Sequence, residues 1–215
     1  MNTKKTLAIG ATTVAVAFAA AACGDTDTGT TTAPSSVVTS TTTAAAENTA
    51  AHNQADVMFA QMMIPHHSQA IEMSDMLLAK QGIPEPVTAL ASQIKAAQGP
   101  EIDQLTTWLG QWGQPTEMPG DMPGHHDMPG MTGPGAGGME GMMSEQDMQA
   151  LSAAQGTEAA RLFSTQMITH HEGAIGMAQT EIEDGQFPDA VAMARTIVDT
   201  QQQEIDTMRQ LLTTL

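Results

Sequence analysis

The chain has 215 residues, of which 24 are acidic and only 7 are basic, giving a formal net charge of −17 with neutral histidines. Such an acidic surface repels phosphate backbones, so we expect no nucleic-acid partner. Aromatic residues make up 3% of the chain and tyrosine is absent, which disfavours strands and predicts a core of Leu, Ile, Ala and Met.

The N-terminal residues have the pattern of an export signal. Lys4 and Lys5 precede an apolar stretch, 7–22, that is shorter and less bulky than a membrane-spanning helix. Three alanines lead into Cys23, the only cysteine, and this pattern is similar to a lipobox. We therefore predict a lipoprotein signal peptide at 1–22 and an acylated Cys23 that anchors the protein to the outer face of the cell membrane. The alternative is a plain secretory signal that leaves a free thiol.

Two segments have compositions that do not support a packed core. Residues 23–50 are dominated by Thr, Ala and Ser, and residues 114–143 contain Met-Pro-Gly three times among many glycines. We expect a disordered tether at 23–50, and a flexible insertion at 114–143 within a helical domain that spans 51–215.

Two segments, roughly 53–112 and 145–214, repeat each other at an offset of 104 and then 103 residues. The pattern Phe-x-x-x-Met-x-x-His-His-x-x-Ala-Ile-x-Met begins at Phe59 and again at Phe163, and a Glu-Ile-Asp string begins at Glu101 and again at Glu204. Each half predicts two helices joined by a short turn, and neither hairpin can bury its apolar face alone. The predicted fold class is therefore all-α, a four-helix bundle made from two tandem helical hairpins.

The expected helices span 53–80, 86–112, 157–183 and 188–213. A further short helix is expected after Ser144, because Ser144 and Asp147 form the pattern of a capping box.

The first histidine of each pair lies in the apolar seam of its predicted helix. On the first helix the seam residues are three or four positions apart, which places His66 towards the core, and the third helix repeats this seam around His170. We therefore predict that the two imidazoles meet in one central layer, flanked by His67 and His171.

A buried imidazole without a partner costs about 1–3 kcal/mol. A metal ion, or a carboxylate such as Asp56 or Glu172, would supply the partner. A lone buried histidine is more often a hydrogen-bonded core residue than a ligand. Adjacent pairs that recur in both repeats, each with a methionine three residues before and seven after, favour a metal.

The donor types favour copper. Imidazole with thioether and without thiolate suits Cu(I) or Cu(II) better than hard cations, while zinc held by histidine and carboxylate is the alternative. The methionines of the seam, taken alone, are better explained as core packing than as metal ligands.

The insertion carries a second set of candidate ligands in a region with no core to fill. They resemble a flexible collector of soft metal, or else low-complexity sequence without a role. The set comprises Met118, Met122, His125, His126 and Met128.

Pro65 falls inside the first predicted helix, so a kink or local bulge is expected before His66. Thr169 occupies the matching position in the second half, which would make the centre asymmetric.

The two strings around the histidine pairs resemble the bacterial domain-of-unknown-function 305 (DUF305) family over about residues 50–215. The resemblance implies a ferritin-like helical bundle in exported proteins, among them CopM-type copper-binding proteins linked to copper resistance. The acidic position Asp56 has Ala160 as its counterpart, so any role for it cannot be symmetric. The resemblance marks as candidate copper ligands Met63, His66, His67, Met73, Met167, His170, His171 and Met177.

The sequence thus predicts an extracytoplasmic copper-binding lipoprotein that sequesters or hands on copper and catalyses no reaction, with its protein partner unknown. A di-iron oxidase would require Glu-x-x-His pairs, which neither repeat contains. Two alternatives stay open. One is a structural or interaction bundle of the cell envelope with a buried histidine layer and no metal, and the other is a b-type haem bundle with His and Met as axial ligands.

Overall fold

A computed structural model describes residues 51–118 and 140–215. The predicted signal peptide, Cys23, the tether and most of the insertion lie outside these ranges. The described residues, 51–118 and 140–215, belong to one compact unit. Within the described ranges, every helix falls short of the length and hydropathy that crossing a membrane would need.

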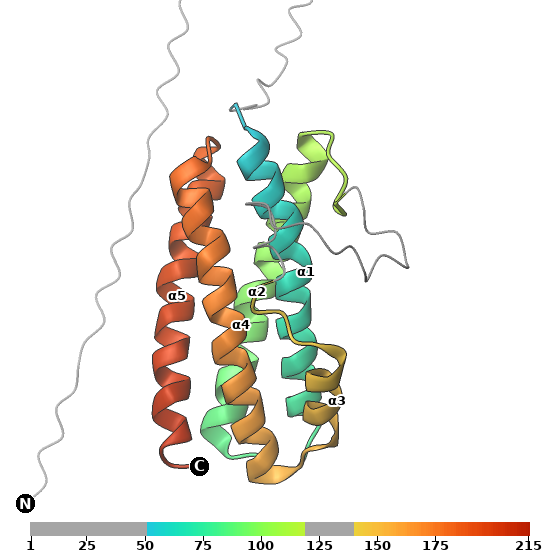
Figure 1. Cartoon of the computed structure of the whole chain (residues 1–215), viewed down its shortest axis with the longest axis vertical. Helices are drawn as coiled ribbons and strands as arrows, with labels where there is room; N and C mark the ends of the chain where they lie inside the picture. Colours follow the sequence, from blue (N-terminus) through green and yellow to red (C-terminus); the bar gives the residue numbers. More distant parts are fainter. Residues whose placement is uncertain (1–50, 119–139) are drawn as a thin grey trace, which may run out of the picture. The chain divides into compact units, whose positions relative to one another are not determined.

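The described residues form five helices and no strand, as predicted. The first hairpin is α1 (Gln54–Leu78) with α2 (Glu85–Gln111), and the second is α4 (Gly156–Asp184) with α5 (Pro188–Leu212). A short helix, α3 (Glu145–Ala153), precedes the second hairpin. Figure 1 shows the four long helices running side by side as a bundle, with α3 against one end. The two hairpins meet mainly where α1 packs on α4.

Local sequence explains where the helices begin. Asn53 caps α1 by accepting hydrogen bonds from the backbone N–H groups of Ala55 and Asp56, while Asp56 accepts one from the Asn53 N–H at 2.6 Å. The predicted capping box of Ser144 and Asp147 opens α3. Each reciprocal pair satisfies N–H groups that a helix start otherwise leaves unpaired.

Pro65 does not interrupt α1. The helix continues through it without a break or a π-helical bulge, so the bulge, one of the two expected distortions, does not form. Pro65 lies on the exposed side of the helix, where solvent can satisfy the carbonyl that lacks an N–H partner. Helix α2 passes through a second proline, Pro100, in the same way.

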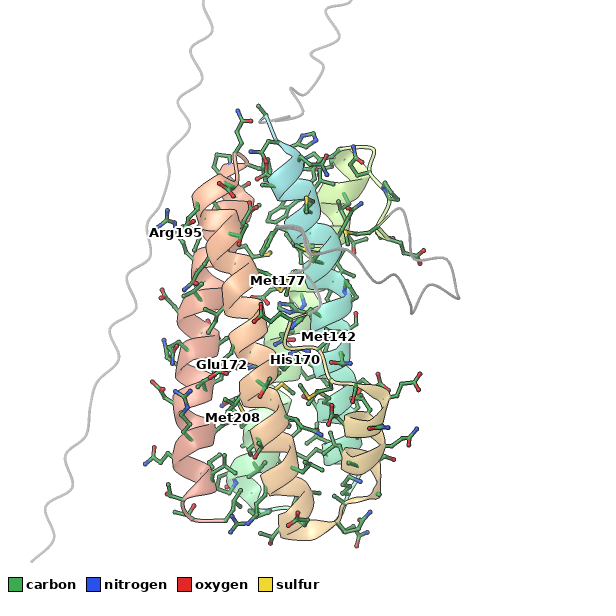
Figure 2. All side chains as sticks on the ribbon, viewed as in Figure 1. Met142, His170, Glu172, Met177, Arg195 and Met208 are labelled. Carbon is green, nitrogen blue, oxygen red and sulfur yellow. The ribbon has the colours of Figure 1, made fainter. Side chains whose placement is uncertain are left out.

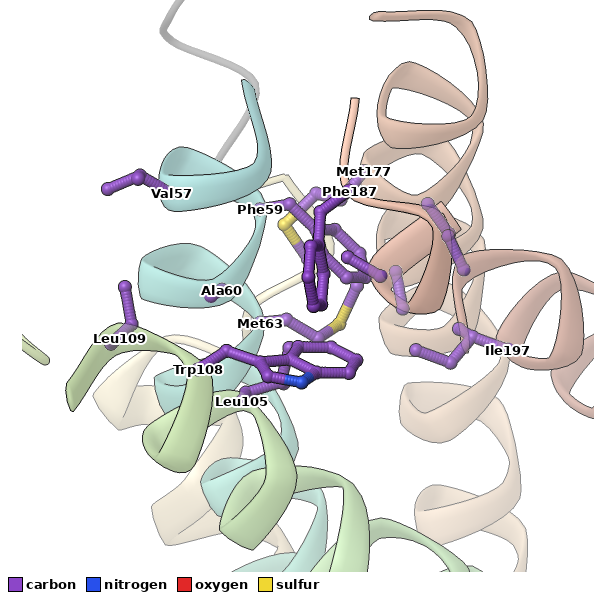
Figure 3. Close-up of a cluster of buried hydrophobic side chains, with 14 residues drawn as sticks. Val57, Phe59, Ala60, Met63, Leu105, Trp108, Leu109, Met177, Phe187 and Ile197 are labelled. Atoms are coloured by element: carbon purple, nitrogen blue, oxygen red, sulfur yellow. The ribbon is translucent and has the colours of Figure 1, made fainter. Parts of the chain in front are cut away.

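The core consists of two apolar clusters stacked along the bundle axis. The upper cluster, shown in Figure 3, gathers around Phe59, Trp108 and Phe187. Its members are Val57, Phe59, Ala60, Met63, Leu105, Trp108, Leu109, Ala174, Met177, Ala178, Phe187, Ala190, Ala194 and Ile197.

The lower cluster occupies the other half of the bundle. Its members are Ala70, Met73, Leu77, Val87, Leu90, Ala91, Ile94, Leu151, Ala159, Ala160, Phe163, Met167, Ile205 and Met208. Each long helix contributes to both clusters and passes from one to the other through a few polar residues. These residues form the site described next.

Candidate metal centre

A layer of buried polar side chains separates the two apolar clusters. Helices α1 and α4 each contribute a histidine pair, and helices α2 and α5 each contribute a glutamine and a glutamate. The members of this histidine layer are His66, His67, Gln98, Glu101, His170, His171, Gln201 and Glu204. All except the two glutamates are at most 3% exposed.

His66 and His170 meet at the centre of the layer, as the repeated seam predicted. Their ring centroids are 3.7 Å apart and the ring planes are inclined by 39°. Neither ring nitrogen of either residue has a hydrogen-bond partner. Four buried polar atoms therefore lie together without a partner, an arrangement that costs free energy unless a ligand binds them.

Both central rings are held in the neutral form. Burial, followed by the neighbouring His67 and His171, lowers the pKa of His66 to about 3. The Glu140 backbone acts in the opposite direction and raises the pKa of His66, but it forms no hydrogen bond with the ring. Burial and the neighbouring histidines likewise lower the pKa of His170 well below its usual value. Neutral imidazoles keep a lone pair, which is the form that binds metal ions.

The outer histidines are oriented by carboxylates. The Nε2 atom of His67 lies 2.7 Å from Oε2 of Glu101, and the Nε2 atom of His171 lies 2.7 Å from Oε2 of Glu204. A carboxylate only accepts hydrogen bonds, so Nε2 carries the proton in the neutral ring and Nδ1 keeps its lone pair. Both Nδ1 atoms are buried without a partner. Such carboxylate–histidine pairs commonly orient metal-binding imidazoles in proteins.

These carboxylates are not the ones that the sequence analysis considered as partners. Glu172 is exposed and pairs with Arg209 at 2.9 Å, while Asp56 lies at the other end of the upper cluster. The true partners come from the opposite helix of each hairpin. The repeated Glu-Ile-Asp strings that begin at Glu101 and Glu204 were the available signal.

Gln98 and Gln201 complete the layer and were not singled out from the sequence. They occupy matching positions of the repeat, three residues before the glutamates. Both are buried. Neither side-chain polar atom of Gln98 has a hydrogen-bond partner, and Oε1 of Gln201 has none. They add hydrogen-bonding capacity beside the imidazoles.

The four candidate methionine ligands lie on both sides of the layer. Met63 and Met177 belong to the upper cluster, whereas Met73 and Met167 belong to the lower one. Figure 2 shows Met177 on one side of His170 along the bundle axis. Each methionine is also a packed core residue, so burial alone does not distinguish ligand from filler.

Histidine and carboxylate alone do not form a closed metal site. Among residues 51–118 and 140–215, no group of three or more His, Cys, Asp or Glu side chains is arranged to hold an ion. The two central imidazoles offer two nitrogen donors, and the thioethers of the two apolar clusters are additional donors of suitable softness.

A short strap, residues 140–143, crosses the bundle beside the layer. An added Cβ at Gly173 would lie 2.1 Å from the Glu140 carbonyl oxygen, and one at Gly141 would lie 2.8 Å from the Thr169 carbonyl oxygen. Gly141 also has a φ of +84°, which disfavours other residues. The Gln69 side chain fixes the strap by hydrogen bonds to Met143 N and O at 2.7 and 2.9 Å. The backbone of the strap therefore packs directly on α4, one turn from His170.

Asp56 has a structural role instead. Its Oδ1 atom accepts hydrogen bonds from the backbone N–H groups of Gln186 and Phe187 at 3.0 and 2.8 Å, which ties α1 to the α4–α5 turn. Burial, followed by the neighbouring Asp56, raises the pKa of Glu181 to about 9. Glu181 is therefore a neutral carboxyl at pH 7 and can donate its proton to Asp56.

The second set of candidate ligands is only partly described. Met118 is 38% exposed and lies beside Met142 at a surface depression. The other members, Met122, His125, His126 and Met128, lie outside the described residues.

Known proteins share this fold. The family model described as "Domain of unknown function (DUF305)" matches residues 56–212. A DUF305 candidate secreted protein from Streptomyces coelicolor is 31% identical, with 74% of this chain and 93% of that one covered and a TM-score of 0.65. A DUF305 fragment from Deinococcus radiodurans is 32% identical, with 76% and 98% covered and a TM-score of 0.62.

A third similar structure contains a metal. CopM in its Cu(II)-bound form is 31% identical, with 74% of this chain and 96% of that one covered and a TM-score of 0.60. CopM also has Cu(I)-bound and Ag-bound forms. No curated protein sequence matches this chain.

Proposed function

The chain belongs to the DUF305 family, and from this premise and the geometry of the histidine layer we propose that it binds copper between its two helical hairpins. The observation that carries the proposal is the set of six buried imidazole nitrogens without partners, four on His66 and His170 and one each on His67 and His171. A protein core rarely leaves so many polar atoms unpaired. A bound ion would satisfy one nitrogen of each ring that coordinates it.

The donor set favours a soft metal. Neutral imidazoles in an apolar core flanked by thioethers suit Cu(I), with Cu(II) accommodated by the imidazoles. The CopM structures with Cu(I), Cu(II) and Ag bound support this choice. In this chain we assign His66 and His170 as the central ligands, and His67 and His171 as outer ligands that Glu101 and Glu204 orient.

The remaining candidate ligands are the four methionines of the repeated strings. Met63 and Met177 would approach the imidazoles from the upper cluster, and Met73 and Met167 from the lower cluster. We propose that these thioethers complete the coordination from both faces of the layer.

We further propose that the protein works outside the cytoplasm as a lipoprotein anchored through Cys23, where it sequesters copper or hands it on. The apolar stretch before Cys23 supports this location, as does the relative from Streptomyces coelicolor that is named as a candidate secreted protein. We propose no catalysed reaction.

A haem-binding role fits this centre poorly. The His66 and His170 rings are in contact at 3.7 Å, so a macrocycle between them would require the hairpins to separate. The bundle without metal is a second candidate, because the pairing of both outer histidines with carboxylates would also stabilise a purely structural polar layer.

A Cu(I) competition titration against a chromophoric chelator separates these two functions. We would use residues 47–215, which contain both apolar clusters, and compare the parent with a variant that replaces His66, His67, His170 and His171 by alanine. The proposal predicts tight binding by the parent that the variant loses. Equal and weak uptake by both proteins would leave the structural bundle as the function.

A further inference from the structure

A groove between α1 and α4 runs along the upper half of the bundle towards the central histidines, and its lining ends one helical turn from them, at Met62 and Gly173. It encloses about 450 Å³, and its α1 wall carries Met58 and Met62 while its α4 wall carries Gly173, Gly176 and Met177. The groove is open at Gly176, whereas at Gly173 the Glu140 carbonyl of the strap fills the space beside the helix. Nothing lies within 4 Å of the position that a Cβ would take at Gly176.

The helices that form both walls of the groove also carry the central histidines, one turn beyond the last lining residues. On α1, Met58, Met62 and His66 follow at intervals of four residues, so they share one face at steps of about 6 Å along the axis. On α4, Met177 and Gly173 lie seven and three residues beyond His170, again on one face. The two series meet at the pair of central rings, which are in contact with each other.

The methionines of the α1 wall are not explained by core packing alone. Met58 and Met62 are only half-buried, and Met58 belongs to neither apolar cluster. This distinguishes them from Met63, which is fully buried in the upper cluster. Thioethers that face a solvent-accessible groove are available to bind a soft cation.

The rim of the groove is acidic. Its lining contains the carboxyl groups of Glu140, Glu172, Glu181 and Asp184 and no basic side chain. Arg209 pairs with Glu172 from outside the lining, and Glu181 is the neutral carboxyl described above. A groove bordered by carboxylates raises the local concentration of cations.

We propose that this groove is the entry route for a soft monovalent cation to His66 and His170, with the thioethers of Met58 and Met62 as transient ligands on the way. The proposal rests on the proposed copper-binding function and adds the path by which the ion reaches that centre. An entry route changes the rates of loading and release by the same factor, so it leaves the equilibrium affinity unchanged.

The loading of metal-free residues 47–215 with Ag(I), a redox-inert stand-in for Cu(I), tests the route. Stopped-flow tryptophan fluorescence is a suitable readout, because the two tryptophans of the chain, Trp108 and Trp112, lie in or against the upper cluster. Gly176→Leu plugs the groove without a backbone clash. Gly110→Leu on α2 is its matched control, since that position is equally open and lies outside the groove.

A second pair of variants tests the thioethers. Met58→Leu with Met62→Leu keeps the apolar bulk but removes both sulfurs, and Met76→Leu, on the same helix at the far end, is the control. We expect loading at least tenfold slower in the plugged and thioether-free proteins, loading within twofold of the parent in both controls, and equilibrium affinities within twofold throughout.

Different outcomes would overturn the proposed copper-binding function and the proposed entry route. A parent that takes up no Ag(I) at the core would overturn the proposed function itself. A parent that binds tightly, with the plugged or the thioether-free protein loading equally fast, would overturn the entry route alone. A lower equilibrium affinity in the thioether-free protein would make these methionines permanent ligands and would also overturn it.

Discussion

Replacing His66 and His170 by leucine should stabilise the metal-free protein. The two rings bury four nitrogens without partners between two apolar clusters. One unpaired polar atom in each ring, at about 1–3 kcal/mol apiece, amounts to roughly 2–6 kcal/mol. Imperfect packing of the new side chains would offset part of this, by up to about 1.5 kcal/mol at each site. We expect a net gain of about 2–4 kcal/mol, or roughly 4–16 °C in Tm for a domain of this size.

The order of stabilities should reverse when metal is added. A ligand at a thousand times its Kd stabilises the protein that binds it by about 4 kcal/mol, and only the parent keeps the central donors. Urea unfolding of both proteins, with a chelator and then with excess Ag(I), measures both effects. The double variant His67→Leu with His171→Leu is the control, because it breaks the hydrogen bonds to Glu101 and Glu204 and should gain no comparable stability. If the metal-free variant with His66→Leu and His170→Leu were less stable than its parent, the expected gain would be wrong, and the rings would have partners in the native state.

Three further predictions concern pH and packing. Because the folded-state pKa of His66 is about 3 and the usual value is 6.5, the unfolded state binds more protons below pH 6.5. As the pH falls below 6.5, the free energy of unfolding of the metal-free protein should therefore decrease by up to about 1.4 kcal/mol per pH unit for each such histidine. An unfolding free energy that stays constant between pH 6.5 and 4 would contradict this. Glu181 has the opposite sign: its pKa is raised from 4.5 to about 9, so its contribution is complete below pH 4.5 and is lost as the pH rises towards 9. Glu181→Gln should remove this decline in urea titrations, and parallel profiles for parent and variant would exclude it. Gly173→Ala should lower the unfolding free energy by about 1–3 kcal/mol, because the new Cβ would lie 2.1 Å from the Glu140 carbonyl oxygen. Amide hydrogen exchange in the strap should become faster. Unchanged exchange would show that the position of the strap does not depend on this contact.

The repeat and the seam were sufficient to predict the bundle and the meeting of His66 with His170. Helix periodicity is a local property, and the expected helix bounds agree with α1, α2, α4 and α5 to within two residues. The internal symmetry then placed equivalent residues in one layer. Residues 112–118 leave the helix after α2, and most of the predicted insertion at 114–143 lies outside the described residues.

The partners of the outer histidines could not be derived in this way. Glu101 lies 34 residues from His67, and Glu204 lies 33 residues from His171, so each contact depends on how the two helices of a hairpin are rotated against each other. The partners expected from the sequence, Asp56 and Glu172, are instead carboxylates that lie near the histidines along the chain. The strap was equally out of reach, because the contact of Gly141 with Gly173 joins segments that no local pattern connects.

Tertiary packing explains why helix α1 forms no bulge at Pro65. Proline removes one backbone hydrogen bond, but the helix is held on both sides by core residues, Met63 on one turn and Ala70 on the next. Tertiary packing of the seam therefore outweighs the local cost.

The proposed metal site gives a reason for the unfavourable polar layer in the core. Unpaired buried polar atoms lower stability, and they persist where function requires them. The flanking apolar clusters supply the packing that holds the rings in place, while the carboxylates of Glu101 and Glu204 fix the outer rings with their Nδ1 lone pairs free.

The most direct test is X-ray absorption at the copper edge of Cu(I)-loaded residues 47–215, measured for the parent and for the variant with His66→Leu and His170→Leu. We expect imidazole scattering together with a sulfur shell in the parent, and a clearly smaller imidazole contribution in the variant, which keeps only His67 and His171. A parent spectrum without imidazole scattering, or one that the two substitutions leave unchanged, would show that copper is held elsewhere on the chain.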